Sequence, residues 1–156
     1  MIQIMDLKHV RLLLLVFSLL MVGLTGCETD RETSPILPGE TAVLVLNFVP
    51  SPVYESYGNE YRFTVFIDEV NGVGATITSM KVESIDSEGN VIDTDNYDEN
   101  RVVDTFGTSY IQAYGRLITS VEVECFGCAR ESWLVRAEDD EGNHVEYSQS
   151  VELIER

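Results

Sequence analysis

The order of apolar and polar side chains along the chain changes abruptly near residue 27. Residues 12–22 form an apolar run in which Ser18 is the one polar side chain. From Thr41 onward, short apolar groups alternate with polar residues and are separated by turn residues. Alternation with a period of two is typical of strands that bury one face. After Thr41 no stretch has apolar residues at the spacing of a helix over three turns. The pattern predicts an all-β domain behind a short apolar leader.

The alternation also predicts which side chains each strand buries. The expected core positions of four strands are Tyr61, Phe63, Val65 and Ile67; Leu117, Val121, Val123 and Cys125; Trp133, Val135 and Ala137; and Val145, Tyr147, Val151 and Leu153. Between Ile77 and Met80 the alternation slips by one residue, which would turn core side chains to solvent unless the strand bulges. We therefore expect a bulge at Thr78 and Ser79.

Glycine-containing polar stretches predict the connections between these strands. Residues 86–90 should form a tight turn into a short strand at 91–94, and residues 95–100 should form a polar loop. Residues 139–143 should form a hairpin turn built on Gly142 and Asn143. Seven or eight strands in about 115 residues suit an antiparallel two-sheet sandwich.

The last part of the chain resembles the closing hairpin of bacterial immunoglobulin-like domains. WLVRAEDDEGNHVEYSQSVEL, which begins at Trp133, reads as a strand, an acidic glycine turn and a final strand, and residues 71–79 share the likeness. The resemblance implies an immunoglobulin-like sandwich over residues 42–156 and no particular activity. Antibody domains join their sheets by a disulfide beside a core tryptophan, whereas Cys125 and Cys128 are three residues apart. Trp133 is therefore expected to be a plain core anchor.

The leader has the organisation of an export signal. Lys8, His9 and Arg11 precede the apolar run, and the run is shorter than the roughly 20 residues that a spanning helix needs. A basic segment followed by a short apolar one is typical of a signal peptide.

The four residues that end the leader, Leu24, Thr25, Gly26 and Cys27, resemble the lipobox of bacterial lipoproteins. This resemblance implies that a signal peptidase recognises the first three and removes residues 1–26, and that the Cys27 thiol carries a diacylglyceryl group. Two acyl chains give stable attachment to a membrane without crossing it. The alternative is an ordinary secreted protein in which Cys27 is incidental.

The expected mature protein is a lipid-anchored protein of the bacterial cell envelope, on the periplasmic face or at the cell surface. Residues 27–41 would supply the acylated cysteine and a flexible, polar, proline-containing tether.

Strong acidity limits the partners of this protein. The chain has 10 basic and 27 acidic residues, and removal of the leader takes two basic and one acidic residue, which leaves a formal charge of −18. Such a charge repels nucleic acid and anionic lipid head groups. We therefore expect no nucleic-acid partner, and an unidentified protein or glycan in addition to the membrane.

Cys125 and Cys128 form a Cys-x-x-Cys pair with Phe126 and Gly127 between them. Opposed residues across a tight turn have Cα atoms about 5.5 Å apart, within disulfide range, and an extracytoplasmic location favours oxidation. The first expectation is a structural disulfide that staples a hairpin. Unpaired thiols, or a thiol/disulfide redox protein or enzyme, remain alternatives, while two sulfurs alone fall short of a zinc site.

Common catalytic groups are scarce in the expected mature chain. His144 is its one histidine and Lys81 its one lysine, so neither a histidine-based nucleophile site nor a phosphate-binding Gly-Lys loop is indicated. We therefore expect that the protein is not an enzyme and binds no cofactor.

Calcium binding is the best alternative use of the many carboxylates, because calcium prefers oxygen ligands. The candidate ligands fall in two clusters: Asp93, Asp95 and Asp98, and Asp139 and Asp140. The first cluster departs from the EF-hand pattern, since Tyr97 occupies the fifth position and Asp98 the position of the glycine. Solvated acidic loops are the other interpretation of both clusters.

Overall fold

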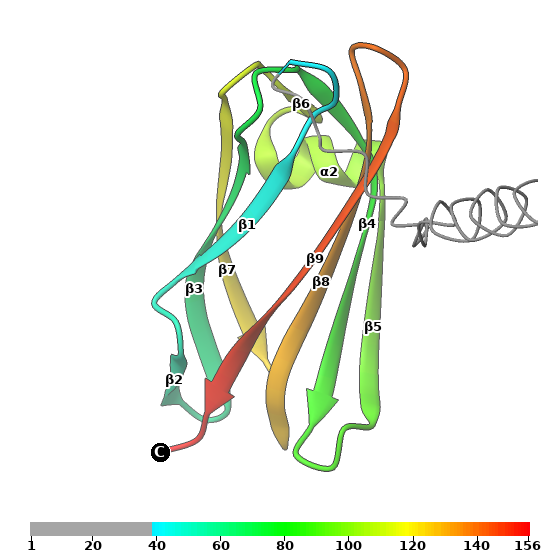
Figure 1. Cartoon of the computed structure of the whole chain (residues 1–156). Coiled ribbons are helices and arrows are strands. Elements are labelled where there is room, and N and C mark those ends of the chain that lie inside the picture. The colour runs from blue at the N-terminus through cyan, green and yellow to red at the C-terminus, as the bar shows by residue number, and fades with distance from the viewer. Residues whose placement is uncertain (1–38) are drawn as a thin grey trace, which may run out of the picture. The chain divides into compact units, whose positions relative to one another are not determined.

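Nine strands and one short helix make up residues 39–156, the part of the chain that the computed structural model describes (Figure 1). Their bounds are β1 Leu44–Val49, β2 Val53–Tyr57, β3 Glu60–Glu69, β4 Ala75–Asp86, β5 Val91–Asp98, α2 Glu99–Phe106, β6 Tyr110–Ile111, β7 Arg116–Glu124, β8 Cys128–Asp139 and β9 His144–Ile154. The described range holds no helix with the length and apolar character needed to cross a membrane.

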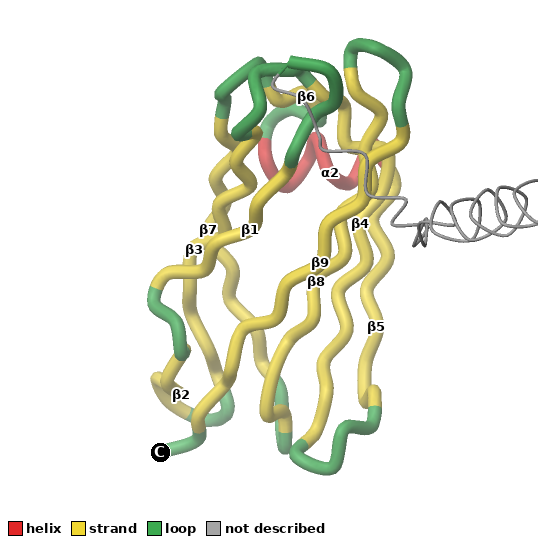
Figure 2. The backbone as a smooth tube through the Cα atoms, viewed as in Figure 1, coloured by secondary structure: helices red, strands yellow, loops and turns green. Residues whose placement is uncertain are grey.

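The strands form two layers that are joined along one side. β1, β3 and β7 pair antiparallel in one layer, and β9, β8, β4 and β5 pair antiparallel in the other. β2 pairs with β3 and, in parallel, with β9, so it links the layers by hydrogen bonds. On the opposite side β5 and β7 are both edge strands and do not pair with each other (Figure 2). The fold is an immunoglobulin-like sandwich, as the sequence predicts, with one open side.

The core forms where the alternation predicts it. Alternate residues of β3 and β8 are buried, and the Trp133 ring packs edge-to-face against Phe48 and Phe63 at centroid distances of 6.0 and 6.5 Å. Trp133 is thus a core anchor. The expected bulge is confirmed, because the pairing of β4 with β8 shifts register between Ile77 and Ser79. The hairpin turn at 139–143 is also confirmed, with Gly142 at φ 81°.

Two expectations for residues 91–106 are wrong. β5 continues to Asp98 where a loop was expected, and α2 follows it directly. The helix begins because the Asp98 side chain accepts a hydrogen bond from the backbone N–H of Arg101, at 2.9 Å, as an N-cap does. Gly107, at φ 81°, ends it, and Val102 is its one buried residue. A single anchoring valine leaves too little helical periodicity to detect in the sequence.

A buried carboxylate, Glu69, organises the loops at the end of the sandwich where Gly39 lies. Glu69 is only 2% exposed, and its oxygens accept hydrogen bonds at 2.8–3.2 Å from four backbone N–H groups, those of Val43, Asn71, Gly72 and Tyr114. Burial works to raise the pKa of this carboxyl, but the four donors together outweigh burial and lower it. Glu69 therefore joins three loops as a charged hub.

Candidate functional site

A cavity of about 250 Å³ opens between the edge strands β5 and β7, on the open side of the sandwich. α2 packs against β4, β5 and β7 at one end of this side, where the Thr119 hydroxyl donates to the Thr105 carbonyl at 3.0 Å. The cavity occupies the stretch beyond the helix. We call it the acidic cleft; its lining residues are Val82, Ser84, Asp93, Asp95, Tyr97, Val121, Glu122, Val123, Glu124, Cys125, Glu131 and Trp133.

The most deeply placed carboxylate of the acidic cleft is Glu131, which is 3% exposed. Glu131 lies two residues before Trp133 on β8, so strand alternation puts both side chains on the inner face. The Trp133 indole N–H donates to Glu131 Oε2 at 3.0 Å. Burial raises the pKa of Glu131 to about 6, the Trp133 hydrogen bond opposes that rise, and the negative charge of Asp95 adds to it.

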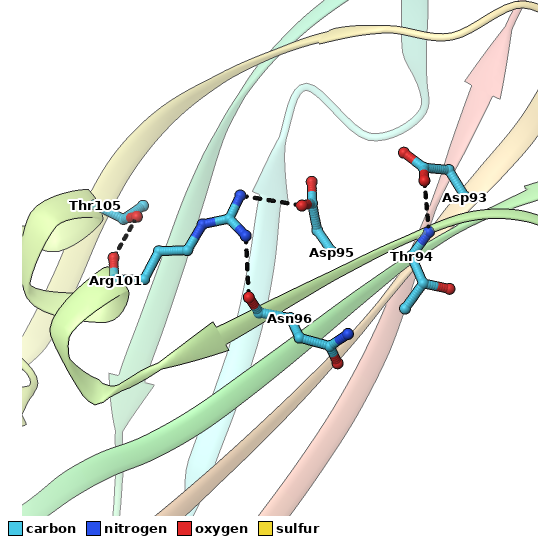
Figure 3. Close-up of polar contacts among 6 residues, drawn as sticks. All are labelled: Asp93, Thr94, Asp95, Asn96, Arg101 and Thr105. Carbon is cyan, nitrogen blue, oxygen red and sulfur yellow. Dashed lines mark hydrogen bonds and ion pairs between the residues drawn. The ribbon is translucent and has the colours of Figure 1, made fainter.

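β5 contributes two carboxylates and an aromatic ring through its inner face. Asp93, Asp95 and Tyr97 alternate along the strand, and Figure 3 shows the two carboxylates rising from the same side of it. Arg101 reaches back from α2 and pairs with Asp95 Oδ1 at 3.0 Å, with its guanidinium 4.0 Å from the centroid of the Tyr97 ring. Among the described residues, Asp93 accepts only from the backbone N–H of the adjacent Thr94. One end of the cleft therefore already holds a stacked, ion-paired guanidinium.

β7 adds Glu122 and Glu124 to the rim. Glu122 pairs with Arg62 at 3.2 Å. Within residues 39–156, however, Asp93, Glu124 and Glu131 form no ion pair with a basic side chain. The cleft therefore has an excess of negative charge that attracts cations.

Cys125 and Cys128 lie at the end of the acidic cleft and are disulfide-bonded in the structure, with Cα atoms 5.7 Å apart. The expected hairpin is wrong: β7 pairs with β3, whereas β8 pairs with β4 and β9, so the turn passes from one sheet to the other. The pair therefore ties the two layers together at this end.

Two aromatic side chains project next to the disulfide. Phe126, at the tip of the Cys125–Cys128 turn, is 85% exposed, and Tyr57, at the end of β2, is 88% exposed. Their turns are joined by a hydrogen bond from the Cys125 N–H to the Asn59 carbonyl, at 2.9 Å. We call Tyr57 and Phe126 the aromatic tip. The ten residues of β3, about 30 Å of strand, separate this end from the one where Gly39 bonds to Asn71 (Figure 1).

The calcium candidates do not converge in the structure. Asp98 caps α2, Asp95 pairs with Arg101, and the Asp140 carboxylate accepts from the Tyr110 hydroxyl at 3.0 Å. Asp139 accepts from four donors of its own chain, including the backbone N–H groups of Ala42 and Asn143. No three Asp, Glu, His or Cys side chains of the described range are placed to share one metal ion.

The remaining residues considered in the sequence analysis lie away from the acidic cleft or outside the described range. His144 is exposed at the start of β9, and Lys81 pairs with Glu83 on β4 at 2.9 Å. The lipobox residues Leu24, Thr25, Gly26 and Cys27 lie outside the described residues. Glu131, Glu122, Glu124 and the aromatic tip are additional candidates that the sequence did not single out.

Replacement of Glu131 by Gln should stabilise the protein at neutral pH. The raised pKa means that the folded state holds a proton that the unfolded state releases near pH 4.5, so stability falls as pH rises from about 4.5 to about 6. Glutamine keeps an acceptor for Trp133 and removes this penalty, a gain of about 2 kcal/mol at pH 7.5 that disappears below pH 4.5. Urea unfolding of wild type and variant at pH 7.5 and below pH 4.5 measures this difference in stability. Glu138→Gln, on the exposed face of β8, is the control, and equal shifts in both variants would contradict the prediction.

Comparisons with known proteins find only distant similarity to solved structures. No protein-family model matches the chain, and the search of curated proteins finds no match. Among solved structures, murine CRIg is 14% identical, with a TM-score of 0.45, over 73% of this chain and 98% of that one. The CARDB domain of a Pyrococcus furiosus protein is 12% identical, with a TM-score of 0.39, over 75% and 97%. At these scores the strand order of the chain itself carries the fold assignment.

Proposed function

We propose that this protein is a lipid-anchored binding module of the bacterial cell envelope. Cys27 attaches it to a membrane, and the immunoglobulin-like domain binds a partner through the aromatic tip and the acidic cleft. The observation that carries the proposal is the continuity of these two surfaces, because Cys125 lines the cleft and Phe126 projects beside it. Exposed aromatic residues on rigid turns are typical of binding surfaces.

The position of this surface fits a tethered protein. The aromatic tip and Gly39 lie at opposite ends of the sandwich, so a domain tethered through the residues before Gly39 can present the tip away from the membrane. The excess negative charge of the cleft favours a cationic partner surface and disfavours anionic lipid.

Redox use of Cys125 and Cys128 is the alternative and has less support. A reactive Cys-x-x-Cys thiolate is stabilised at a helix N-terminus. Within residues 39–156 the single helix begins at Glu99, and the cysteine turn instead connects two strands. Rapid exchange of this disulfide with model disulfides at a mild potential would favour the redox function.

Replacing Cys27 with Ala should release the protein from membranes. If Cys27 carries the acyl chains, the variant loses this lipid anchor, while the folded domain stays unchanged. Membrane fractionation and the intact mass of the mature protein measure this directly. Cys125→Ala with Cys128→Ala is the matched control and should stay in the membrane fraction. A mature wild-type protein without acyl mass at residue 27 would contradict the anchor.

The binding surface can be tested separately from the anchor. A photo-crosslinking residue placed at Phe126 in the full chain should crosslink to a partner in intact cells. The same residue at Glu141, exposed on the turn near Gly39, should give no such product. Equal products from both positions, or none from Phe126, would refute the proposed surface.

A further inference from the structure

We propose that the acidic cleft is a binding site for one guanidinium group, an arginine side chain of the partner, with Glu131 as its principal counter-ion. This inference rests on the proposed binding function and specifies the chemistry of its site. Three features carry it: the incomplete hydrogen bonding of Glu131, the size and walls of the cleft, and the arrangement of Arg101.

Glu131 is a buried carboxyl that receives a hydrogen bond from residues 39–156 at only one of its two oxygens. It is 3% exposed, and Trp133 Nε1–H is the single donor that residues 39–156 offer to it, at Oε2. Oε1 has no donor from that part of the chain, and the side chain lines the cleft. The buried side-chain polar atom of residues 39–156 that lacks a partner is the Tyr61 hydroxyl, so Glu131 Oε1 is not sealed from the space of the cleft. A cation that enters the cleft can therefore donate to Oε1, and a charged donor is the stronger partner for a carboxylate.

The size and walls of the cleft suit a single long side chain. Its volume of about 250 Å³ is below the roughly 300 Å³ at which small-molecule sites begin. Val121 and Val123 form an apolar wall on β7, opposite Tyr97 on β5, with carboxylates at the rim and the base. An arginine side chain combines an apolar stem with a charged planar end and matches these walls.

Arg101 shows how the cleft accommodates a guanidinium. At the end of the cleft next to α2, Arg101 pairs with Asp95 and donates to the Asn96 carbonyl at 3.0 Å (Figure 3). Its guanidinium also stacks on the Tyr97 ring. Because Arg101 pairs with Asp95, the carboxylates of Asp93, Glu124 and Glu131 are the ones left for a second cation, and Glu131 is the buried one among them.

Arginine fits this arrangement better than lysine or a metal ion. A guanidinium has five N–H donors in one plane, which can serve separated acceptors and stack on an aromatic ring, whereas an ammonium is a compact, strongly hydrated charge. A metal ion would need several carboxylates within about 2.5 Å of one point, and the described carboxylates do not converge in that way.

Trp133 fluorescence provides a direct test with the full-length lipoprotein in detergent. Trp133 is the only tryptophan, and its N–H bonds to Glu131, so occupancy of the cleft should change its emission. The probes are N-acetyl-arginine amide, the lysine equivalent, and the citrulline equivalent, which has the shape of arginine without its charge. The arginine probe should bind at millimolar concentration, at least fivefold more tightly than lysine, and citrulline should not bind.

Glu131→Gln should weaken binding of the arginine probe at least tenfold, while Glu138→Gln should leave it unchanged. Near-ultraviolet circular dichroism verifies that Glu131→Gln remains folded. Asp93→Asn, which alters an exposed side chain, should weaken binding of the arginine probe by a smaller factor.

Three results would overturn the inference: the lysine or citrulline probe binds as tightly as the arginine probe, Glu131→Gln binds the arginine probe as tightly as wild type, or Trp133 emission responds to calcium or spermidine and not to the arginine probe.

The outcomes also separate this inference from the proposed function. A partner crosslinked at Phe126 without any response to the arginine probe would remove the guanidinium site and leave the binding module. An arginine response without a Phe126 crosslink would support the guanidinium site and move the partner surface away from the aromatic tip.

Discussion

Replacing Glu69 with Gln should lower the free energy of unfolding by about 4 kcal/mol. Both Glu69 oxygens accept from backbone N–H groups, four in all, at a site with almost no access to water. Glutamine puts an NH₂ group where a carboxylate oxygen stood, so at least one or two of these buried donors lose their acceptor. Each loss costs about 1–3 kcal/mol.

Urea denaturation at pH 7 measures the effect, with Glu138→Gln as a control that replaces an exposed glutamate by the same residue. The pH profile gives a second test. Because the pKa of Glu69 is lowered in the folded state, its contribution is complete above the unfolded value near 4.5 and is lost as pH falls below it. The difference in unfolding free energy between Glu69→Gln and wild type should therefore be smallest at low pH. A variant as stable as Glu138→Gln at pH 7 would contradict the role of Glu69.

Replacing Trp133 with Ala should also cost about 4 kcal/mol, for a different reason. Trp133 is 2% exposed, and its ring fills the space between the two sheets against Phe48 and Phe63. Truncation of such a side chain leaves a cavity and removes its aromatic contacts. The buried carboxyl of Glu131 would in addition lose its hydrogen-bond donor.

Trp133→Phe separates the two contributions, because it keeps an aromatic ring and removes the indole N–H. Trp133→Phe should lower the free energy of unfolding by about 2 kcal/mol at pH 7.5. The loss should be smaller at pH 4, because Glu131 is protonated there and no longer needs a donor for a negative charge. Thermal unfolding at both pH values measures the difference. A loss for Trp133→Phe that is the same at both pH values would assign the effect to packing alone.

Alternation along the chain was sufficient to predict most of the fold. Period-two patterns identified the buried faces of β3 and β8, and the slip near Thr78 located the bulge. These predictions succeeded because a strand that buries one face must repeat every second residue. β2 was not recognised, since its five residues have a single buried member, Val53, and little periodicity.

The acidic cleft was missed although the sequence contains a signal for it. Glu69 and Glu131 are in phase with the apolar residues of their strands, so an acidic residue stands where the pattern requires a buried side chain. Such breaks in a consistent pattern are typical of functional or structural sites. Which of the two roles applies depends on the donors that the folded chain brings to each carboxylate. Glu69 has four, two from the loop that follows its own strand and two from distant loops, whereas Glu131 has one, from its own strand.

The open side of the sandwich also affects how copies of this protein behave when crowded together. Unpaired strand edges on β5 and β7 could template sheet formation between neighbouring molecules. Asp93 and Asp95 on one edge, and Glu122 and Glu124 on the other, place carboxylates along both open edges. Charged side chains on an edge strand disfavour pairing with another chain, so the carboxylates of the cleft also disfavour edge-to-edge association of crowded domains.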